Sequence, residues 1–155
     1  MIGERMMNSQ CSNNKWDYRF MNIAREISTW SKDPSTRVGA VCVRNRRILS
    51  TGYNGFPHGV SDNERLNDRL VKYQLTVHGE MNAIYNAVHH GISLNDSSLY
   101  VYGLPICSEC AKGVIQSGVR HVVYTACHAD NYWDEHFLRS KAMFDESGVT
   151  YLKLP

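Results

Sequence analysis

Two short motifs carry side chains that could hold a metal ion and move a proton. The first is His78-Gly79-Glu80, and the second, Cys107-Ser108-Glu109-Cys110, begins 27 residues after the glutamate. One imidazole and two thiols are nitrogen and sulfur ligands, and a catalytic zinc ion uses three such ligands while its fourth position stays open for water. The sequence therefore predicts a catalytic zinc ion bound by His78, Cys107 and Cys110.

We expect a helix to begin at each motif, which would bring the two motifs together at helix starts. Cys107 and Cys110 would then share one helical face, and the positive end of the helix favours the thiolate forms that bind metal. Glu80 is too close to His78 to replace it easily as a ligand, but it can reach a water molecule and a substrate ring nitrogen. Glu80 is therefore predicted to be the catalytic acid/base.

The alternative is a structural zinc site that lacks a fourth ligand, or core cysteines beside a surface histidine. A structural site needs a further cysteine or histidine at short spacing, and neither Cys127 nor His128 belongs to such a pair. A structural site also has no use for an unligated carboxylate beside the metal. The catalytic interpretation is therefore favoured.

The rest of the chain predicts the elements that position these motifs. Apolar residues at three- and four-residue spacing indicate helices, and β-branched runs indicate strands. The expected helices cover residues 16–30, 80–91, 110–118 and 134–148, and the expected strands cover 38–43, 47–53, 99–102, 121–125 and 150–154. A short turn at 44–46 makes a hairpin, and a long exposed loop runs to about Arg69. This order predicts an α/β fold, a three-layer α/β/α sandwich with a mixed five-stranded sheet and a parallel strand pair around the second motif.

Length and charge narrow the class of protein. The chain has 155 residues, the size of one domain, with 43% hydrophobic residues, 21% charged residues and a net charge of +2, which does not suggest binding to a nucleic acid polymer. No apolar run approaches the roughly 18 residues of a membrane span, and the N-terminus lacks a secretory signal. An odd number of cysteines, five, argues against a disulfide framework. We expect a flexible arm over residues 1–15, a single domain over 16–155, and a cytoplasmic location, in the host cytoplasm if the chain is viral.

Four blocks of sequence resemble the deoxycytidylate (dCMP) deaminases of the cytidine deaminase superfamily. They are SKDPSTRVGAV at 31–41, STGYNGFPHGVSD at 50–62, HGEMNAI at 78–84 and CSECAKGVIQSGVRHVVY at 107–124. The zinc motif is common to the whole superfamily, whereas the SKDPST and GYNGFP blocks resemble dCMP deaminases in particular. The resemblance extends over residues 16–154, and it implies a cytidine deaminase-like fold and the same zinc ligands and acid/base.

The resemblance also implies contacts with a nucleotide. Asn54 would hydrogen-bond the sugar 3′-hydroxyl, and the backbone at Gly79 would contact the base O2. Lys32, Ser35 and Thr36 would lie near the 5′-phosphate. For Lys32, a solvated position at the surface stays open as the alternative.

The sequence departs from the family pattern in three places. The usual Pro-Cys is here Pro105-Ile106-Cys107, with Gly103 as the expected site of a bulge, and the usual alanine between the histidine and the glutamate is Gly79. His128 stands where many members place a tyrosine against the nucleotide, and either His128 or Tyr132 could take that role.

Members of the family are commonly hexamers regulated by dCTP and dTTP, which implies a homo-oligomer and triphosphate effectors, with Mg²⁺ bound to the effector. The candidate effector loop begins with Gly55, Phe56 and Pro57. Its alternative is a simple glycine-rich connection.

The predicted function is hydrolysis of dCMP to dUMP and ammonia, which would supply dUMP for thymidylate synthesis. Within enzymes, the same core also deaminates cytidine, other cytosine nucleotides, adenosine in transfer RNA, guanine and a riboflavin precursor. Outside enzymes, the chain could be a zinc-stabilised binding module, and the intact Glu80 argues against that.

Overall fold

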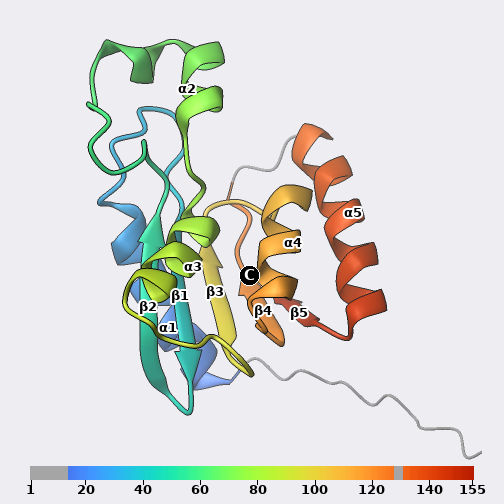
Figure 1. Ribbon diagram of the computed structural model, residues 1–155. Helices are drawn as coiled ribbons and strands as arrows, with labels where there is room; N and C mark the ends of the chain where they lie inside the picture. The colour runs from blue at the N-terminus through green and yellow to red at the C-terminus, as the bar shows by residue number, and fades with distance from the viewer. Residues whose placement is uncertain (1–13, 128–130) are drawn as a thin grey trace, which may run out of the picture.

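The computed structural model describes residues 14–127 and 131–155, and from residue 79 onward its helices and strands alternate along the chain (Figure 1). The helices are α1 (Lys15–Ser28), α2 (Arg69–Leu75), α3 (Gly79–His89), α4 (Ser108–Gln116) and α5 (Asn131–Ser147), with a 3-10 helix, η1, at Glu64–Asn67. The strands are β1 (Gly39–Arg44), β2 (Arg47–Tyr53), β3 (Ser98–Tyr102), β4 (His121–Tyr124) and β5 (Thr150–Lys153). Each helix and strand expected from the sequence is present, and η1 and α2 are additional. Within these described ranges, no helix has the length and apolar character to cross a bilayer.

The five strands form one mixed sheet in the order β2-β1-β3-β4-β5. Strand β1 pairs antiparallel with β2 and β3, whereas β3, β4 and β5 run parallel. Helix α4 connects β3 to β4, and α5 connects β4 to β5, as a parallel pairing requires. The predicted mixed five-stranded sheet and its parallel pair are confirmed.

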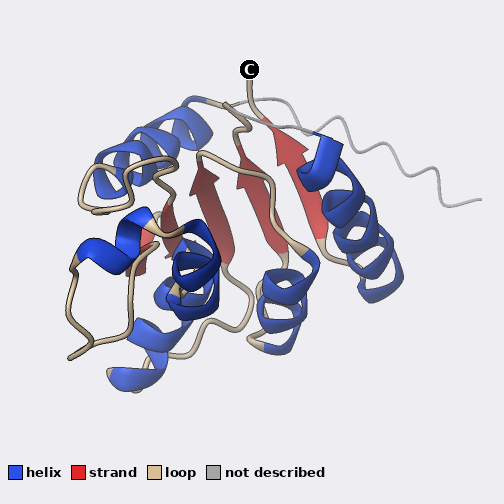
Figure 2. Ribbon diagram, turned by 90° about the horizontal axis from the view of Figure 1, so that it is seen from above, coloured by secondary structure: helices blue, strands red, loops and turns tan. Residues whose placement is uncertain are grey.

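Side chains alternate between the two faces of the sheet, and each face has its own core. Ala40 and Cys42 of β1 pack with side chains of α3, α4 and α5. Val41 and Val43 point the other way and pack with side chains of α1. Figure 2 shows helices on both sides of the sheet. The predicted three-layer α/β/α sandwich is confirmed.

The β1–β2 hairpin closes through a two-residue turn. Asn45 and Arg46 have φ of 52° and 59°, which is the left-handed pair of a type I′ turn. This turn matches the twist of the two strands, and it confirms the short turn expected at residues 44–46.

Helix α1 begins inside the segment expected to be a flexible arm. The side chain of Asn14 accepts hydrogen bonds from the backbone N–H groups of Trp16 and Asp17, and the Asp17 carboxylate accepts one from the Asn14 N–H. This capping box starts the helix at Lys15, one residue before the expected domain start. The rest of the expected arm, residues 1–13, lies outside the described residues.

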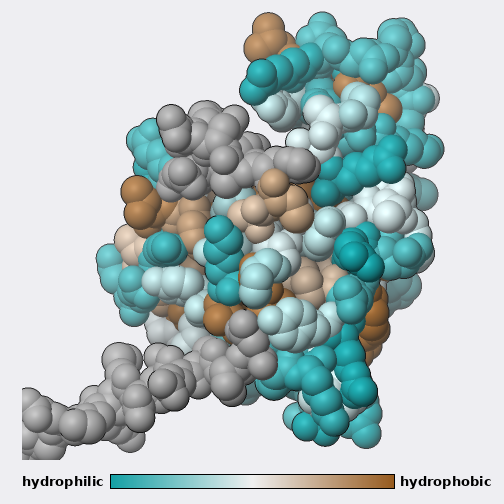
Figure 3. Space-filling model, turned by 180° about the vertical axis from the view of Figure 1, so that it is seen from behind, coloured by the Kyte–Doolittle hydropathy of each residue, from teal (hydrophilic) through white to brown (hydrophobic). Residues whose placement is uncertain are grey.

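The segment between β2 and α3 differs from the expected open loop, because it contains η1 and α2. The Asn63 side chain accepts the backbone N–H of Arg65, and the Asp68 side chain accepts those of Leu70 and Val71. Figure 1 shows this segment projecting beyond the sheet, and its surface in Figure 3 is mostly hydrophilic. Polar caps begin these helices, and each is shorter than the window of about 11 residues over which hydrophobic periodicity indicates a helix. The loop prediction was therefore wrong at η1, and it omitted α2.

Candidate active site

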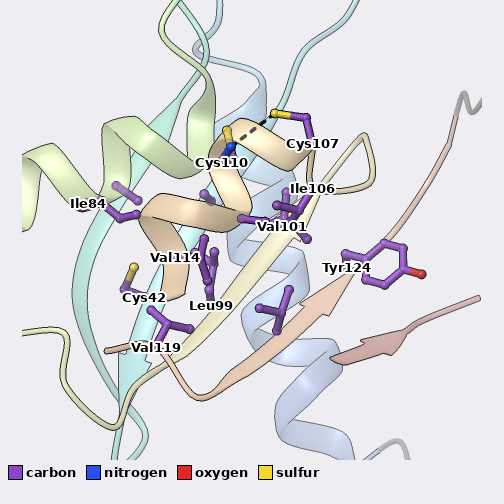
Figure 4. Packing of buried hydrophobic residues seen from close by; sticks show 14 of the residues in the cluster. Cys42, Ile84, Leu99, Val101, Ile106, Cys107, Cys110, Val114, Val119 and Tyr124 are labelled. Atoms are coloured by element: carbon purple, nitrogen blue, oxygen red, sulfur yellow. Dashed lines mark hydrogen bonds between the residues drawn. The ribbon is translucent and has the colours of Figure 1, made fainter. Parts of the chain in front are cut away.

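The predicted metal ligands meet where α3 and α4 begin. His78 is the N-cap residue of α3, and Cys107 is the N-cap residue of α4. His78 Nδ1 lies 3.4 Å from Cys107 Sγ and 3.3 Å from Cys110 Sγ. Figure 4 shows both cysteines at the start of α4, where the Cys110 N–H donates to Cys107 Sγ over 3.4 Å. The fold thus brings together three side chains that are separated by up to 32 residues in sequence.

The spacing of these three ligand atoms fits a zinc ion. All of them lie within 4.8 Å of one another. Tetrahedral zinc, with bonds of about 2.1 Å to nitrogen and 2.3 Å to sulfur, places nitrogen and sulfur ligands about 3.5 Å apart. The two nitrogen–sulfur distances above agree with this value, so the donor set and its geometry suit zinc with one open position.

Contacts within the cluster favour the ionised forms of two of its members. The hydrogen bond from the Cys110 thiol lowers the pKa of Cys107 to about 4, despite the opposing effect of burial. The bond with Cys107 raises the pKa of His78 to about 9. The same thiol–thiolate contact, together with burial, raises the pKa of Cys110. These contacts favour the thiolate form of Cys107, which is the form that binds metal.

Glu80 lies in the first turn of α3 and is only 3% exposed. Burial raises its pKa from 4.5 to about 7, while the nearby His78 acts in the opposite direction. A carboxyl group with a pKa near the working pH can both accept and release a proton, which a general acid/base must do. Glu80 lines the same cleft as His78 and Cys107 of the ligand cluster.

A single cleft joins this cluster to a second polar region. The space between its walls, including the open mouth, is about 620 Å³. Its described lining residues are Asp33, Ser35, Thr36, Val38, Asn54, Lys72, Tyr73, Thr76, His78, Gly79, Glu80, Leu104, Pro105 and Cys107. The structure therefore brings most of the candidate site residues named from the sequence to one cleft.

Asn54 lines the cleft, but much of its amide is used within the protein. Its Oδ1 accepts the backbone N–H of Val38 at 2.8 Å, and its Nδ2 donates to the Thr36 carbonyl at 2.9 Å. These bonds attach the end of β2 to the chain that enters β1. A carboxamide has two N–H groups and two lone pairs on oxygen, so one donor and one acceptor remain for a ligand.

Lys32 does not line the cleft, and Lys72 does. The Lys32 side chain is 69% exposed and pairs with Asp62 at 2.9 Å, so the solvated alternative describes its position. Lys72 is 6% exposed and reaches the cleft from α2. Sequence reasoning missed Lys72 because it missed α2, and the Asp68 cap four residues earlier was the available signal.

Two of the three departures from the family pattern have a structural explanation. A Cβ added at Gly79 would lie 3.2 Å from the Val38 carbonyl oxygen, so the glycine lets α3 start close to Val38, the residue before β1. Ile106 is fully buried, and Figure 4 shows it in the core beside Val101. The extra residue is thus absorbed by the core.

The bulge expected at Gly103 is not there. Gly103 follows the last residue of β3 with a φ of 120°, and the register shift of this sheet lies between Cys42 and Val43. A Cβ at Gly103 would come within 2.7 Å of the Arg37 carbonyl oxygen, which explains the glycine.

The candidate effector residues lie outside the cleft lining. Gly55 exchanges backbone hydrogen bonds with Val77 at 3.1 and 2.8 Å, and Arg65 stacks over the Phe56 ring at 5.7 Å. Pro57 is exposed. His128, the third departure, lies outside the described residues, and so does the side chain of Tyr132.

Comparison with known proteins gives consistent matches. A family model described as the cytidine and deoxycytidylate deaminase zinc-binding region matches residues 14–126. The chain is 40% identical over 144 residues to an uncharacterised deaminase in the luxG 3′ region of Aliivibrio fischeri, covering 91% of this chain and 95% of that one. It is 35% identical over 147 residues to the deoxycytidylate deaminase of Homo sapiens, covering 90% and 79% of the two chains. The dCMP deaminase of cyanophage S-TIM5, solved with dCMP and dUMP, matches with a TM-score of 0.70 and 25% identity over 88% of this chain and 95% of that one.

Proposed function

This chain belongs to the cytidine and deoxycytidylate deaminase family, and from that premise we propose that it hydrolyses dCMP to dUMP and ammonia and so supplies dUMP for thymidylate synthesis. Relatives named deoxycytidylate deaminase and a similar structure solved with dCMP and dUMP support this substrate. The observation that carries the proposal is the buried Glu80 carboxylate in the same cleft as His78 and Cys107, two members of the ligand set that Cys110 completes. A binding module would not require a proton carrier at that position.

The residues of the cleft divide the work of a hydrolytic deamination. Zinc held by the histidine and the two cysteines would supply Lewis acidity, which lowers the pKa of water. Glu80 takes one proton from the attacking water as the water oxygen bonds to C4 of the cytosine, and gives that proton to N3. It then moves the second proton of that oxygen to the 4-amino group. The C4–N bond breaks, ammonia leaves and the C4 carbonyl forms, so water and dCMP are converted to dUMP and ammonia.

Two further features of the cleft suit a cytosine ring. Val38, Leu104 and Pro105 give it apolar walls, which can pack against the faces of a base. Gly79 is the first residue of α3, so its backbone N–H has no partner within the helix and can donate to the base O2. These contacts would place C4 near Glu80.

The direct test is ammonia release from zinc-loaded protein supplied with dCMP, CMP, deoxycytidine or dCTP, each with and without a chelator. We expect turnover mainly of dCMP, and loss of that turnover when zinc is removed. If zinc-loaded protein turns over none of these cytosine compounds, the proposed substrate is wrong and another base or a binding role must be sought.

The regulatory and organisational expectations belong to the same proposal. We propose a single catalytic domain over residues 16–155, a hexamer, and dCTP and dTTP effectors that bind with Mg²⁺ near Gly55, Phe56 and Pro57. The proposed cytoplasmic location follows from the substrate, because charged nucleotides are intracellular metabolites. Light scattering would test the hexamer, and ammonia release with added dCTP or dTTP would test the effectors.

A further inference from the structure

A second polar cluster lines the cleft, away from the metal ligands. The Lys72 ammonium donates to Ser35 Oγ at 2.6 Å and to Asp33 Oδ1 at 3.1 Å. Among the described residues that line the cleft, Lys72 is the only lysine or arginine. A lysine that is 6% exposed is rare unless its charge has a partner, and here the partner is the buried Asp33 carboxylate.

Asp33 accepts hydrogen bonds from other groups besides Lys72. Its Oδ1 also accepts the backbone N–H of Ser35 at 2.8 Å, the backbone N–H of Thr36 at 3.0 Å and the Ser35 hydroxyl at 2.9 Å. Asp33 therefore shapes the loop at residues 33–36 through its own hydrogen bonds, and its negative charge is shared among several donors. An ammonium group has three N–H donors, and Asp33 and Ser35 account for two of those of Lys72.

We infer that Lys72 binds the 5′-phosphate of the substrate and thereby makes the site prefer a nucleotide to a nucleoside. This inference rests on the proposed function. A nucleotide carries its base at one end and its phosphate at the other, and the cleft is lined both by His78 and Cys107 of the metal-ligand set and by the group of Lys72, Asp33 and Ser35. The hydroxyl groups of Ser35 and Thr36 lie beside the ammonium and suit phosphate oxygens.

Lys32 is the competing candidate from sequence, and its position does not suit this role. Its ammonium is paired with Asp62 on the outside of the loop, and it is not among the cleft residues. Exposed ion pairs of this kind contribute little to stability or binding. Assigning the phosphate to Lys72 or to Lys32 therefore predicts opposite results in the same experiment.

The experiment compares kcat/KM for dCMP and deoxycytidine in Lys72→Met, with Lys32→Met as the competitor and Lys153→Met, at an exposed strand end, as the matched control. A hydrogen bond to a charged group contributes about 1.5–3 kcal/mol, so Lys72→Met is expected to lower kcat/KM for dCMP by roughly 10- to 150-fold. The value for deoxycytidine, which has no phosphate, should stay within about 3-fold of wild type, and Lys32→Met and Lys153→Met should keep the wild-type ratio. If the role of Lys72 were purely structural, its replacement would instead lower kcat/KM equally for both substrates.

Removing Lys72 alone also removes a partner from buried Asp33 and can destabilise the fold. The double variant Asp33→Asn, Lys72→Met keeps a carbonyl oxygen for the N–H groups of residues 35 and 36 and leaves no unpaired charge, so it is measured alongside. Equal losses for both substrates in a folded variant, a lost preference in Lys32→Met, or a wild-type enzyme that uses deoxycytidine as well as dCMP would each overturn the inference. Turnover of neither substrate by zinc-loaded wild type would instead refute the proposed function.

Discussion

Replacing Glu80 with glutamine removes the proton carrier and keeps the shape of the side chain. The other ionisable groups of the described cleft lining already have partners or roles, because His78 and Cys107 belong to the metal-ligand set, Asp33 and Lys72 pair with each other, and the Tyr73 hydroxyl accepts a hydrogen bond from Arg69. A positioned acid/base contributes about 10²–10⁴-fold to a rate. With no substitute in the cleft we expect the upper part of that range, a fall in kcat for dCMP of roughly 10³- to 10⁴-fold, or about 4–5.5 kcal/mol in the barrier.

The Glu80→Gln variant should lose activity, but its stability should stay the same or increase. The rise in the pKa of Glu80 from 4.5 to about 7 is equivalent to about 3 kcal/mol against the ionised carboxylate in the folded protein. The sign follows from linkage, since a raised acid pKa means that stability falls as pH rises from 4.5 towards 7 and stays lower above it. Glutamine stays neutral throughout, so Glu80→Gln should unfold at the same temperature as wild type or at a higher one at neutral pH.

Three measurements on the same preparation test this reasoning, namely ammonia release, bound zinc by elemental analysis and the melting temperature. Glu109→Gln is the matched control, because Glu109 lies between the two cysteines in sequence while its side chain is 78% exposed and pairs with Lys112. The control should keep wild-type turnover. Glu80→Gln protein that retains zinc and loses less than about 10-fold in turnover would refute the assignment of Glu80 as the proton shuttle.

Three further substitutions test the metal site, the start of β4 and the entry to α4. Cys107→Ala should lose bound zinc in elemental analysis and melt at a lower temperature, because metal binding contributes to folding; full zinc occupancy would contradict the ligand assignment. Burial lowers the pKa of His121 below 6.5, so wild type should lose more stability than His121→Gln as pH falls below 6.5, and parallel melting curves would exclude this effect. Ser140 is fully buried and donates to the Ile106 carbonyl at 2.8 Å, so Ser140→Ala should cost about 1–3 kcal/mol in chemical denaturation, whereas Ser147→Ala, at a helix end, should cost under about 0.5 kcal/mol.

The metal ligands and Glu80 could be predicted from the sequence because their signals are local. Two motifs, each placed at an expected helix start, fix which side chains can meet once the strand order is set. The strands were equally visible, since β1 and β4 are short, mostly buried runs that contain valines. These signals consist of residue type and spacing. Residue type and short spacing are nearly sufficient to predict a metal site.

The phosphate end of the cleft could not be predicted in the same way. Lys72 lies on a seven-residue helix. In the sequence, that helix is indicated only by its polar cap. The contact from Lys72 to Asp33 also spans 39 residues, and nothing in the spacing of either residue points to the other. The block at residues 31–36, which resembles dCMP deaminases, led instead to Lys32. Lys32 is adjacent to Asp33 in sequence, but it faces solvent.

Gly52 shows how a fold can determine a site through a residue that carries no chemistry. Gly52 lies within β2, inside the strand expected at 47–53, and a Cβ there would overlap backbone atoms of Ala83 and of Gly79 in α3. Helix α3 can therefore lie directly on the strand, where Asn82 and Asn86 donate to the carbonyls of β2, each at 2.7 Å. These contacts fix the first turn of α3 against the sheet, and His78 and Glu80 are held at that turn. The position of the proton carrier thus depends on the absence of a side chain at residue 52, a requirement that only the packed structure reveals.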